Sequence, residues 1–203
     1  MIGYQPERTA YMNGMERIAV FCGSSQGHDE RYAQAAKAMA VAMADRGVGL
    51  VYGGGNIGLM GLVAETLHSK GGAVVGVIPR KLHLPKICNT IVHDELLVVE
   101  GMHERKAEMY RRADGFVALP GGIGTFEEIL EIFTWQQLRY HTKPVAILNT
   151  AGFYDGLLAF LRHSCDEGFI KSVVMESLLV DDDPARLLLR METQVVALPE
   201  KII

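Results

Sequence analysis

Three short apolar runs in this sequence each end at a cluster of glycine or other small residues. The runs are residues 17–22 before Gly23-Ser24-Ser25, residues 49–52 before Gly53-Gly54-Gly55, and residues 115–119 before Pro120-Gly121-Gly122. An apolar run without polar alternation is typical of a strand buried on both faces, and glycine permits the sharp turn that follows it. The pattern therefore predicts buried parallel strands with glycine-rich loops at their carboxyl ends.

Segments with helical spacing alternate with these strands. Apolar residues recur every third or fourth position over residues 32–43, and Gly47 marks the end of that helix. Further along we expect helices at 57–69, 125–140 and 153–167, and strands at 73–78 and 145–148. This order predicts an α/β fold: a Rossmann-like doubly wound parallel sheet in a single domain, with helices on both faces. Such sheets bind ligands at the carboxyl ends of their strands, where the glycine clusters fall.

Length and composition limit the possible partners. The chain has 203 residues, and we expect one domain over 15–192, a flexible tail over 1–14 and a second tail over 193–203. With 49% apolar and 22% charged residues, the composition excludes a disordered chain and a coiled coil. A formal net charge of −4 without a basic block argues against binding to a nucleic-acid polymer.

The sequence also argues against a membrane partner. No run approaches the ~18 consecutive apolar residues that a membrane span needs, and the first residues lack the apolar core of a secretory leader. The 3 cysteines are widely spaced and include no CxxC pair, which fits a reducing compartment. We therefore expect a cytoplasmic protein.

The first glycine cluster, residues 53–58, satisfies the GxGxxG pattern between a predicted strand and a predicted helix. A dinucleotide site would also need an acidic residue about twenty positions later, and the next strand leads into Pro79-Arg80 instead. This disfavours NAD, while Arg80 leaves NADP as a weak alternative. Close packing of backbone and contact with a phosphate are equal alternatives for this loop.

The second glycine cluster offers a better anion site. Residues 120–125 lack the Gly-Lys-Ser/Thr ending of an ATP-hydrolysing loop. Backbone N–H groups at Gly121, Gly122 and Gly124, the hydroxyl of Thr125 and the positive end of the next helix suit a phosphate. The spacing of Thr125 and Glu128 is also that of a capping box, in which the glutamate bonds back to the start of the helix. The spacing alone favours the cap.

A charged helical segment at 102–112 precedes this loop. Arg105, Met109 and Arg112 share one helix face, and Lys106 points about 100° away. By default such a segment is a solvated face with ion pairs along it. His103-Glu104 resembles the start of a zinc-binding HExxH motif, but position 107 is alanine, and we expect neither a metal nor a cofactor.

Taken together, these motifs resemble the Lonely Guy family. The resemblance rests on GGGNIGLMG at 53–61, MHERK at 102–106 and PGGIGTFEE at 120–128, and it extends from about Ile18 to about Leu189. It implies a Rossmann-like homodimer that hydrolyses the bond between base and ribose in AMP or N6-substituted AMP. The products would be adenine or a cytokinin base and ribose 5-phosphate.

The resemblance also implies roles for individual residues. Arg105 and Glu128 would be the catalytic pair. The implied substrate contacts are Ser24, Gly53, Gly54, Gly55, Lys106, Gly121, Gly122, Gly124, Thr125 and Thr134. Related sequences often carry a glutamate in a Pro-Lys-Glu context where this chain has Ile87, which affects the expected choice among N6 substituents. The catalytic role requires Thr125 to cap the helix alone while Glu128 points into the cleft.

The chemistry of glycosidic hydrolysis fits these residue types. The transition state resembles an oxocarbenium ion, which a carboxylate such as Glu128 can stabilise while it orients or deprotonates water. The alternative is a carrier of similar glycine-rich fold that binds a nucleotide or the molybdenum cofactor without cleaving it. A carrier does not need a charged pair beside a sugar, so Arg105 and Glu128 distinguish the two.

Overall fold

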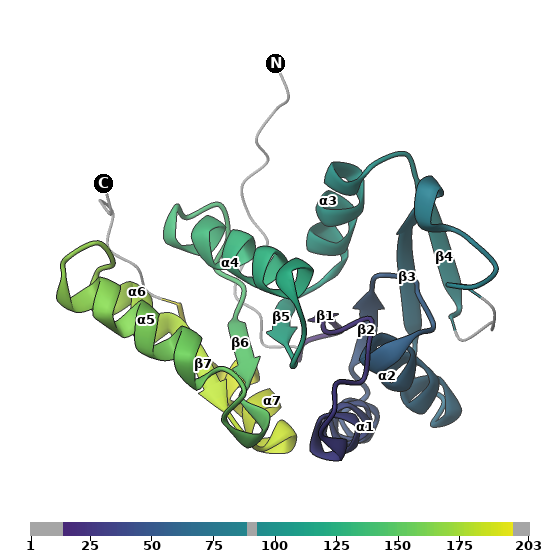
Figure 1. Ribbon diagram of the computed structural model, residues 1–203, viewed down its shortest axis with the longest axis horizontal. Helices are drawn as coiled ribbons and strands as arrows, with labels where there is room; N and C mark the ends of the chain where they lie inside the picture. The colour runs from purple at the N-terminus through teal and green to yellow at the C-terminus, as the bar shows by residue number, and fades with distance from the viewer. Residues whose placement is uncertain (1–13, 89–92, 197–203) are drawn as a thin grey trace.

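The computed structural model describes residues 14–88 and 93–196, in which all seven strands belong to one parallel sheet (Figure 1). The order across the sheet is β4-β3-β2-β1-β5-β6-β7. The strands are β1 (Arg17–Phe21), β2 (Gly49–Tyr52), β3 (Val74–Pro79), β4 (Glu95–Val99), β5 (Gly115–Ala118), β6 (Val145–Leu148) and β7 (Leu178–Asp181). The predicted doubly wound parallel sheet is confirmed.

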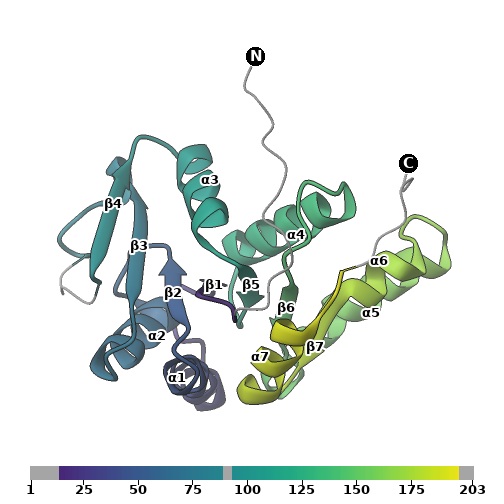
Figure 2. The same cartoon turned by 180° about the vertical axis from the view of Figure 1, so that it is seen from behind.

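Helices cover both faces of the sheet (Figures 1 and 2). One face carries α1 (Glu30–Asp45), α2 (Gly58–Ser69) and α7 (Pro184–Thr193). The other face carries α3 (Met102–Arg112), α4 (Ile123–Gln137), α5 (Asp155–Asp166) and α6 (Ser172–Ser177). Two short 3₁₀ turns, η1 (Arg80–Leu82) and η2 (Thr150–Gly152), lie in the connections.

The central strands supply side chains to both layers of the core. In β1, Ile18 and Val20 pack beneath α1 and α7, whereas Ala19 and Phe21 face α3 and α4. This alternation follows from the two-residue period of a strand, and it explains why the whole run is apolar. Because both faces are covered, only the loops at the strand ends are left for a ligand.

The strand order reverses between β1 and β5. From β1 the chain builds the sheet outward through β2, β3 and β4, and after α3 it returns to place β5 on the other side of β1. The loops that follow β1 and β5 therefore lead to opposite faces, which is the usual position of a binding crevice in such folds. The backbone N–H of Gly23 donates to the carbonyl of Pro120 at 3.0 Å and joins the two loops.

Several predicted boundaries differ from the structure. The helix expected at 125–140 begins two residues earlier and ends at Gln137. The predicted tail at 1–14 lies, apart from Gly14, outside the described residues, as does the predicted C-terminal tail from residue 197 onward. In the described part of the chain no helix combines the length and the apolar character that crossing a bilayer requires.

Candidate active site

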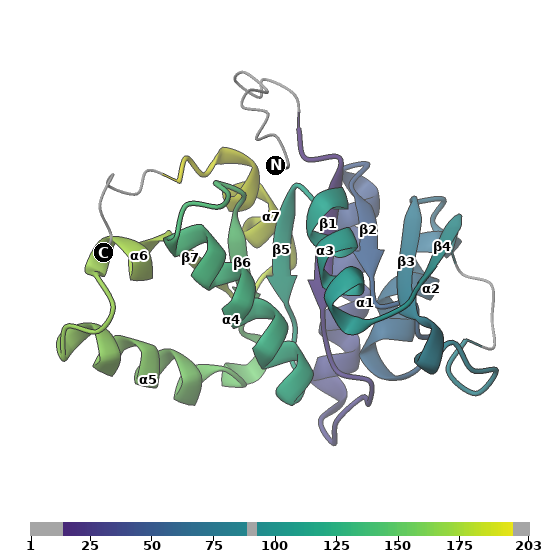
Figure 3. The same ribbon diagram turned by 90° about the horizontal axis from the view of Figure 1, so that it is seen from above.

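An ion pair between α3 and α4 lies at the carboxyl end of the sheet. Nη1 of Arg105 donates to Oε1 of Glu128 at 2.6 Å, and both side chains are about nine-tenths buried. Nε of Arg105 also donates to the carbonyl of Val77 in β3 at 3.3 Å. Figure 3 shows the two helices in front of the sheet, where they bring residues from distant parts of the sequence together. The segment 102–112 is therefore not simply a solvated face, because Arg105 points inward.

The environment of Glu128 makes its carboxyl group less acidic than an exposed glutamate. Burial raises the pKa of Glu128, and the positive charge of Arg105 opposes this rise without cancelling it. Cys22, at the end of the β1 run, is buried close by, and burial followed by the charge of Glu128 raises the pKa of its thiol. The carboxylate thus has a poorly solvated setting in which its charge acts strongly on a neighbouring cation.

Gly53 makes room for this pair. A Cβ atom at position 53 would overlap Nη2 of Arg105, so the loop after β2 must lack a side chain there. The next residue, Gly54, has φ +75°, and a Cβ there would stand 3.0 Å from Ile78. Gly53 and Gly54, two of the predicted contact residues, therefore pack closely against Arg105 and Ile78.

The helix that follows this loop has its positive end occupied by the chain itself. The N–H groups of Leu59 and Met60, at the start of α2, donate to the carbonyl of Gly23 at 3.0 and 3.4 Å. Gly58 has φ +62°, and a Cβ there would overlap the backbone of Ser24 and Ser25. For the GxGxxG loop, this arrangement favours close packing over phosphate contact. Ser24 itself is exposed in the loop after β1.

The start of α4 is open. Its N-cap is Gly122, and no side chain bonds to the first turn. Side chains added at Gly122 or Gly124 would meet nothing within 4 Å, and Ile123 between them is 81% exposed. Gly121 is different, because a Cβ there would overlap Thr125 and stand 2.9 Å from the N–H nitrogen of Gly23. The free N–H groups of this turn can therefore receive an anion.

The capping-box prediction for Thr125 and Glu128 is wrong. Because α4 begins at Ile123, Thr125 is the third helical residue and is buried, and it cannot be the cap. Glu128 bonds to Arg105 instead of folding back to the start of the helix. The glycine at 122 takes the cap position with an extended backbone, which spacing alone could not distinguish from a threonine cap.

The remaining predicted contacts lie apart from the open turn. Lys106 Nζ is bound by Glu127 and Glu131 of α4, at 2.5 and 2.9 Å. Thr134 is exposed on α4, and its hydroxyl donates to the carbonyl of Leu130 at 2.7 Å. Thr134 lies six positions after Glu128 on α4, and the structure of one chain does not bring the two side chains together.

The structure adds Glu131 and Tyr110, which the sequence did not single out, and it places Ile87 beside the first glycine loop. Glu131 and Tyr110 line a small hollow beside Glu128, together with Phe21, Lys106 and Ile132. Ile87 packs on Gly55, where its Cγ2 would lie 3.2 Å from an added Cβ, and its carbonyl accepts from the N–H of Asn56 at 2.8 Å. Over the described ranges, no cluster of histidine, cysteine and acidic residues has the arrangement of a metal site.

The fold is shared with solved structures of low sequence identity. The molybdenum cofactor binding protein from Rippkaea orientalis superposes with a TM-score of 0.63 at 20% identity, over 85% of this chain and 92% of that one. The molybdenum cofactor carrier protein from Chlamydomonas reinhardtii gives 0.62 at 21% identity, over 85% and 93%. At these identities the similarity establishes the fold alone.

Sequence relatives are much closer. The cytokinin riboside 5′-monophosphate phosphoribohydrolase LOG2 of Arabidopsis thaliana is 48% identical over 179 residues, which are 88% of this chain and 84% of the relative. LOG5 of the same plant is 51% identical over 156 residues, 77% and 68% of the two chains. The probable enzyme LOGL3 of Oryza sativa subsp. japonica is 52% identical over 155 residues, 76% and 73%.

A family model also matches the chain. The model, described as "possible lysine decarboxylase", matches residues 60–191 and so includes α3, α4 and the loop between β5 and α4. The match covers more than half of the chain, and the match to LOG2 is longer, at 179 residues. The chain therefore belongs to the Lonely Guy family, the family of these phosphoribohydrolases.

Proposed function

We propose that this protein hydrolyses the N-glycosidic bond of AMP or of N6-substituted AMP and releases the free base and ribose 5-phosphate. The observation that carries the proposal is the buried Arg105–Glu128 pair beside the open first turn of α4. The ion pair provides a carboxylate that can stabilise a cationic sugar. The first turn of α4 provides N–H groups that can bind a phosphate. The phosphoribohydrolase activity for which the relatives are named supports hydrolysis of this kind.

In the proposed reaction, the bond between C1′ and the base nitrogen breaks and the oxygen of a water molecule bonds to C1′. Glu128 stabilises the developing positive charge on the sugar and accepts a proton from the attacking water. The base leaves with one proton gained, so that base and ribose 5-phosphate together contain the atoms of one added water. A raised pKa makes the Glu128 carboxylate a better acceptor for the proton of the attacking water than an exposed glutamate would be.

Arg105 and the turn at 121–125 hold the rest of the nucleotide. Arg105 orients the Glu128 carboxylate and can donate a further hydrogen bond to a ribose hydroxyl. The N–H groups at Gly122, Ile123 and Gly124 bind the 5′-phosphate, which is remote from the bond that breaks. Binding energy from the phosphate then positions the sugar for attack.

The base would lie over the loop after β2. Across the sheet, β5 and β2 lie on opposite sides of β1, so a nucleotide with its phosphate at α4 extends past Arg105 toward Gly53–Gly55. Ile87 and Met60 contact this loop and give the base end an apolar wall. We therefore propose that an N6 substituent is accepted by packing and not by a charged partner.

We also propose that the protein acts as a homodimer in the cytoplasm. The family resemblance supports the dimer, and Leu138 and Tyr140 at the end of α4 are exposed apolar side chains that a second copy could cover. The three cysteines are free thiols, which supports a reducing compartment.

The experiment is a panel of nucleotides scored for released base. Incubation of the pure protein with AMP, N6-isopentenyl AMP and adenosine should release base from the two monophosphates and not from adenosine. Release from adenosine at a similar rate would contradict the phosphate anchor. If the protein binds AMP without releasing adenine, the alternative of a non-catalytic carrier replaces this proposal, and that outcome would agree with the fold shared with the molybdenum cofactor proteins.

A further inference from the structure

Lys106 is held by two carboxylates of the neighbouring helix. Its ammonium donates to Oε1 of Glu127 at 2.5 Å and to Oε1 of Glu131 at 2.9 Å, and only 13% of the side chain is exposed. Burial alone would lower the pKa of Lys106, but the two hydrogen bonds outweigh it and the pKa is raised. Glu127 and Glu131 are four residues apart on α4, so one ammonium can bridge both.

This arrangement is unlike that of a phosphate ligand. The ammonium of Lys106 carries one positive charge and its two carboxylate partners carry two negative charges, so the cluster as a whole is negative and does not attract an incoming anion. Lys106 follows Arg105 directly in α3, and Glu127 precedes Glu128 directly in α4. The Lys106–Glu127 ion pair therefore lies next to the Arg105–Glu128 ion pair on both helices. The lysine bridge therefore fixes the spacing and rotation of the helices that present Arg105 and Glu128 to each other.

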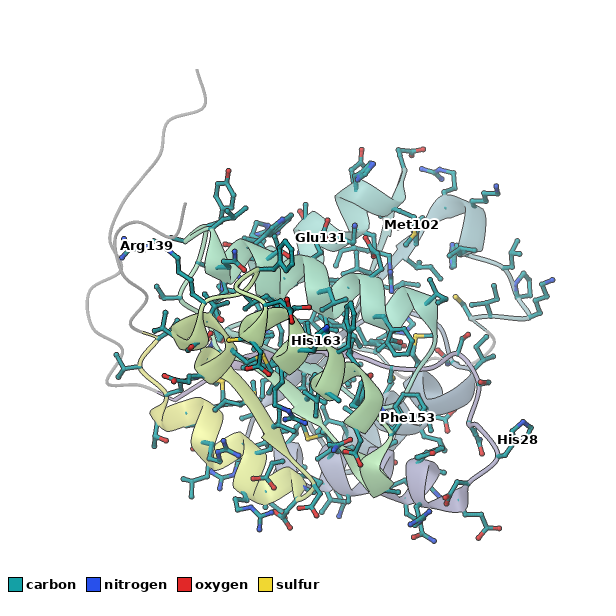
Figure 4. The ribbon with its side chains drawn as sticks, turned by 60° about the vertical axis from the view of Figure 1, so that its left-hand side comes forward. His28, Met102, Glu131, Arg139, Phe153 and His163 are labelled. Carbon is teal, nitrogen blue, oxygen red and sulfur yellow. The ribbon has the colours of Figure 1, made fainter. Side chains whose placement is uncertain are left out.

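Glu131 is the more constrained of the two carboxylates on the lysine. Its side chain is 26% exposed, against 50% for Glu127. Its second oxygen, Oε2, is buried and has no hydrogen-bond partner within the described residues. Glu131 also lines the hollow beside Glu128, and Figure 4 shows it on α4 in the layer that includes Met102 at the start of α3. The Lys106–Glu131 pair is therefore less screened by solvent than the Lys106–Glu127 pair.

We propose that Glu131 is a positioning residue of the site, which holds Lys106 across the gap between α4 and α3 and so keeps Arg105 opposite Glu128. This inference rests on the proposed hydrolysis for its kinetic test. It reassigns Lys106 from substrate contact to part of the same positioning bridge. The substrate is then held by Arg105, Glu128 and the open turn of α4, without the lysine.

The charges around Glu128 allow a sharp test. The groups that face it are Arg105 and Lys106 on α3, Glu127 and Glu131 on its own helix, and the Cys22 thiol from the sheet. Removing a negative charge from this set lowers the pKa of Glu128, and removing a positive charge raises it. Two substitutions that break the same ion pair should therefore shift the acid side of the pH profile in opposite directions.

The experiment compares Glu131→Gln with Lys106→Met, using AMP as substrate. Both variants should lower kcat about tenfold with little change in KM, because the sugar is bound but the pair is less well placed. The acid limb of kcat against pH should move to lower pH in Glu131→Gln and to higher pH in Lys106→Met. Glu131→Asp, which keeps the charge, should leave the limb in place and recover part of kcat. Glu108→Gln, which breaks the ion pairs with Arg111 and Arg112 at the other end of α3, should behave as the wild type.

Two outcomes would overturn the proposal. A large rise in KM for AMP in Lys106→Met, with kcat kept, would make the lysine a phosphate ligand. If the acid limb shifts equally in both variants, or if kcat does not change, the bridge only packs the helices together and does not position Arg105 and Glu128. If no nucleotide is cleaved, the proposed function fails separately. The bridge can then still be tested by NMR titration of the Glu128 carboxyl carbon, which should show the same opposite shifts.

Discussion

The guanidinium of Arg105 lies directly against the Cα of Gly53, so closely that any side chain at position 53 would overlap Nη2. The glycine follows β2 and the arginine belongs to α3, and the sulfur of Met60 in α2 lies 3.4 Å from the position that a Cβ atom of residue 53 would take. Three elements thus meet around one charged group. The first glycine loop contributes to the site by giving the arginine space, and this leads to the first prediction.

Gly53→Ala should displace Arg105 and separate it from Glu128. The added methyl group replaces the guanidinium in space, whereas the backbone at this position has an ordinary negative φ that alanine can adopt. We expect kcat/KM for AMP to fall by about 10²-fold, since a shift near 1 Å in a reacting group costs on this order. Thermal unfolding by circular dichroism should show a much smaller effect. An unchanged rate would contradict the contact between loop and arginine.

Glu128→Gln should abolish adenine release with little effect on stability. Glutamine keeps the size of the side chain and can still accept a hydrogen bond from Arg105, but it cannot stabilise a sugar cation or bind the proton of water. We expect kcat to fall by at least about 10³-fold, measured by chromatography of released adenine. The melting temperature should move by no more than about 3 °C. Full activity in this variant would remove Glu128 from the mechanism.

The pH dependence should follow the titration of Glu128. Burial raises its pKa above the ordinary value of 4.5, and the reaction uses the carboxylate, so kcat should fall as the pH drops through a pKa higher than 4.5. The same shift affects folding: the native state binds this proton more tightly than the unfolded chain. The contribution of Glu128 to stability should therefore decrease as the pH rises from below 4.5 through the native pKa. A kcat profile flat down to pH 4 would contradict this assignment.

The two glycines at 121 and 124 should respond differently to alanine. A methyl group at Gly124 meets no atom within 4 Å and lies at the open end of α4, so Gly124→Ala should fold normally and raise KM for AMP about tenfold by obstructing the phosphate. At Gly121 the methyl group would overlap Thr125, so Gly121→Ala should lower the melting temperature by several degrees. If Gly124→Ala leaves KM unchanged, the anion does not bind at this turn.

Arg139→Gly should stabilise the protein. Residue 139 follows α4 with φ +63°, and the bonds from Arg139 N to Gln136 O and from Tyr140 N to Trp135 O, both 2.9 Å, form a Schellman motif. An L residue is strained in this conformation, so glycine should add about 0.5–1 kcal/mol to the free energy of unfolding and raise the melting temperature by roughly 1–4 °C. The matched control is Gly71→Ala, at the same position after α2 with φ +77° and open space around it, which should destabilise by a similar amount. A loss of stability in Arg139→Gly would mean that the arginine side chain makes a compensating contact.

The end of α4 could not be predicted from the sequence pattern. Three other helices, α1, α2 and α5, end with glycine in the left-handed conformation, at Gly47, Gly71 and Gly168. Such an end can be predicted, as it was at Gly47, because glycine adopts this conformation without strain. Arg139 carries no such mark, and the predicted helix accordingly ran on to residue 140. In Figure 4 the label of Arg139 marks this turn, at the edge of the helical layer.

Strands were predictable where burial is complete. The runs that became β1, β2 and β5 are apolar because both faces are covered. β4 lies at the edge of the sheet, begins at exposed Glu95 and is only partly buried, and it was not predicted although residues 96–99 form a short apolar run. The start of α7 has a sequence signature of a helix N-terminus, because Asp183 is the N-cap and Pro184 is the first helical residue.

The candidate site was only partly predictable for a related reason. Motif resemblance named Arg105 and Glu128, and the structure places them in contact, but the burial of Arg105 depends on α4, which begins 18 residues further along the chain. Helical spacing within α3 describes which residues share a face, not which face another helix will cover. The bridge from Lys106 to Glu131 is likewise a contact between helices, which periodicity within either one cannot reveal.

The bond from the start of α2 to Gly23 has one further consequence. Two helices begin after glycine loops at the same edge of the sheet, and both would attract an anion in isolation. The carbonyl of Gly23 fills that role for α2, whereas α4 has no internal substitute. The chain therefore supplies its own hydrogen-bond acceptor to the first turn of α2, and the N–H groups in the first turn of α4 stay open to a negatively charged group. In the proposed function, this difference between the two helices directs the 5′-phosphate to α4 and so sets the direction in which the nucleotide binds.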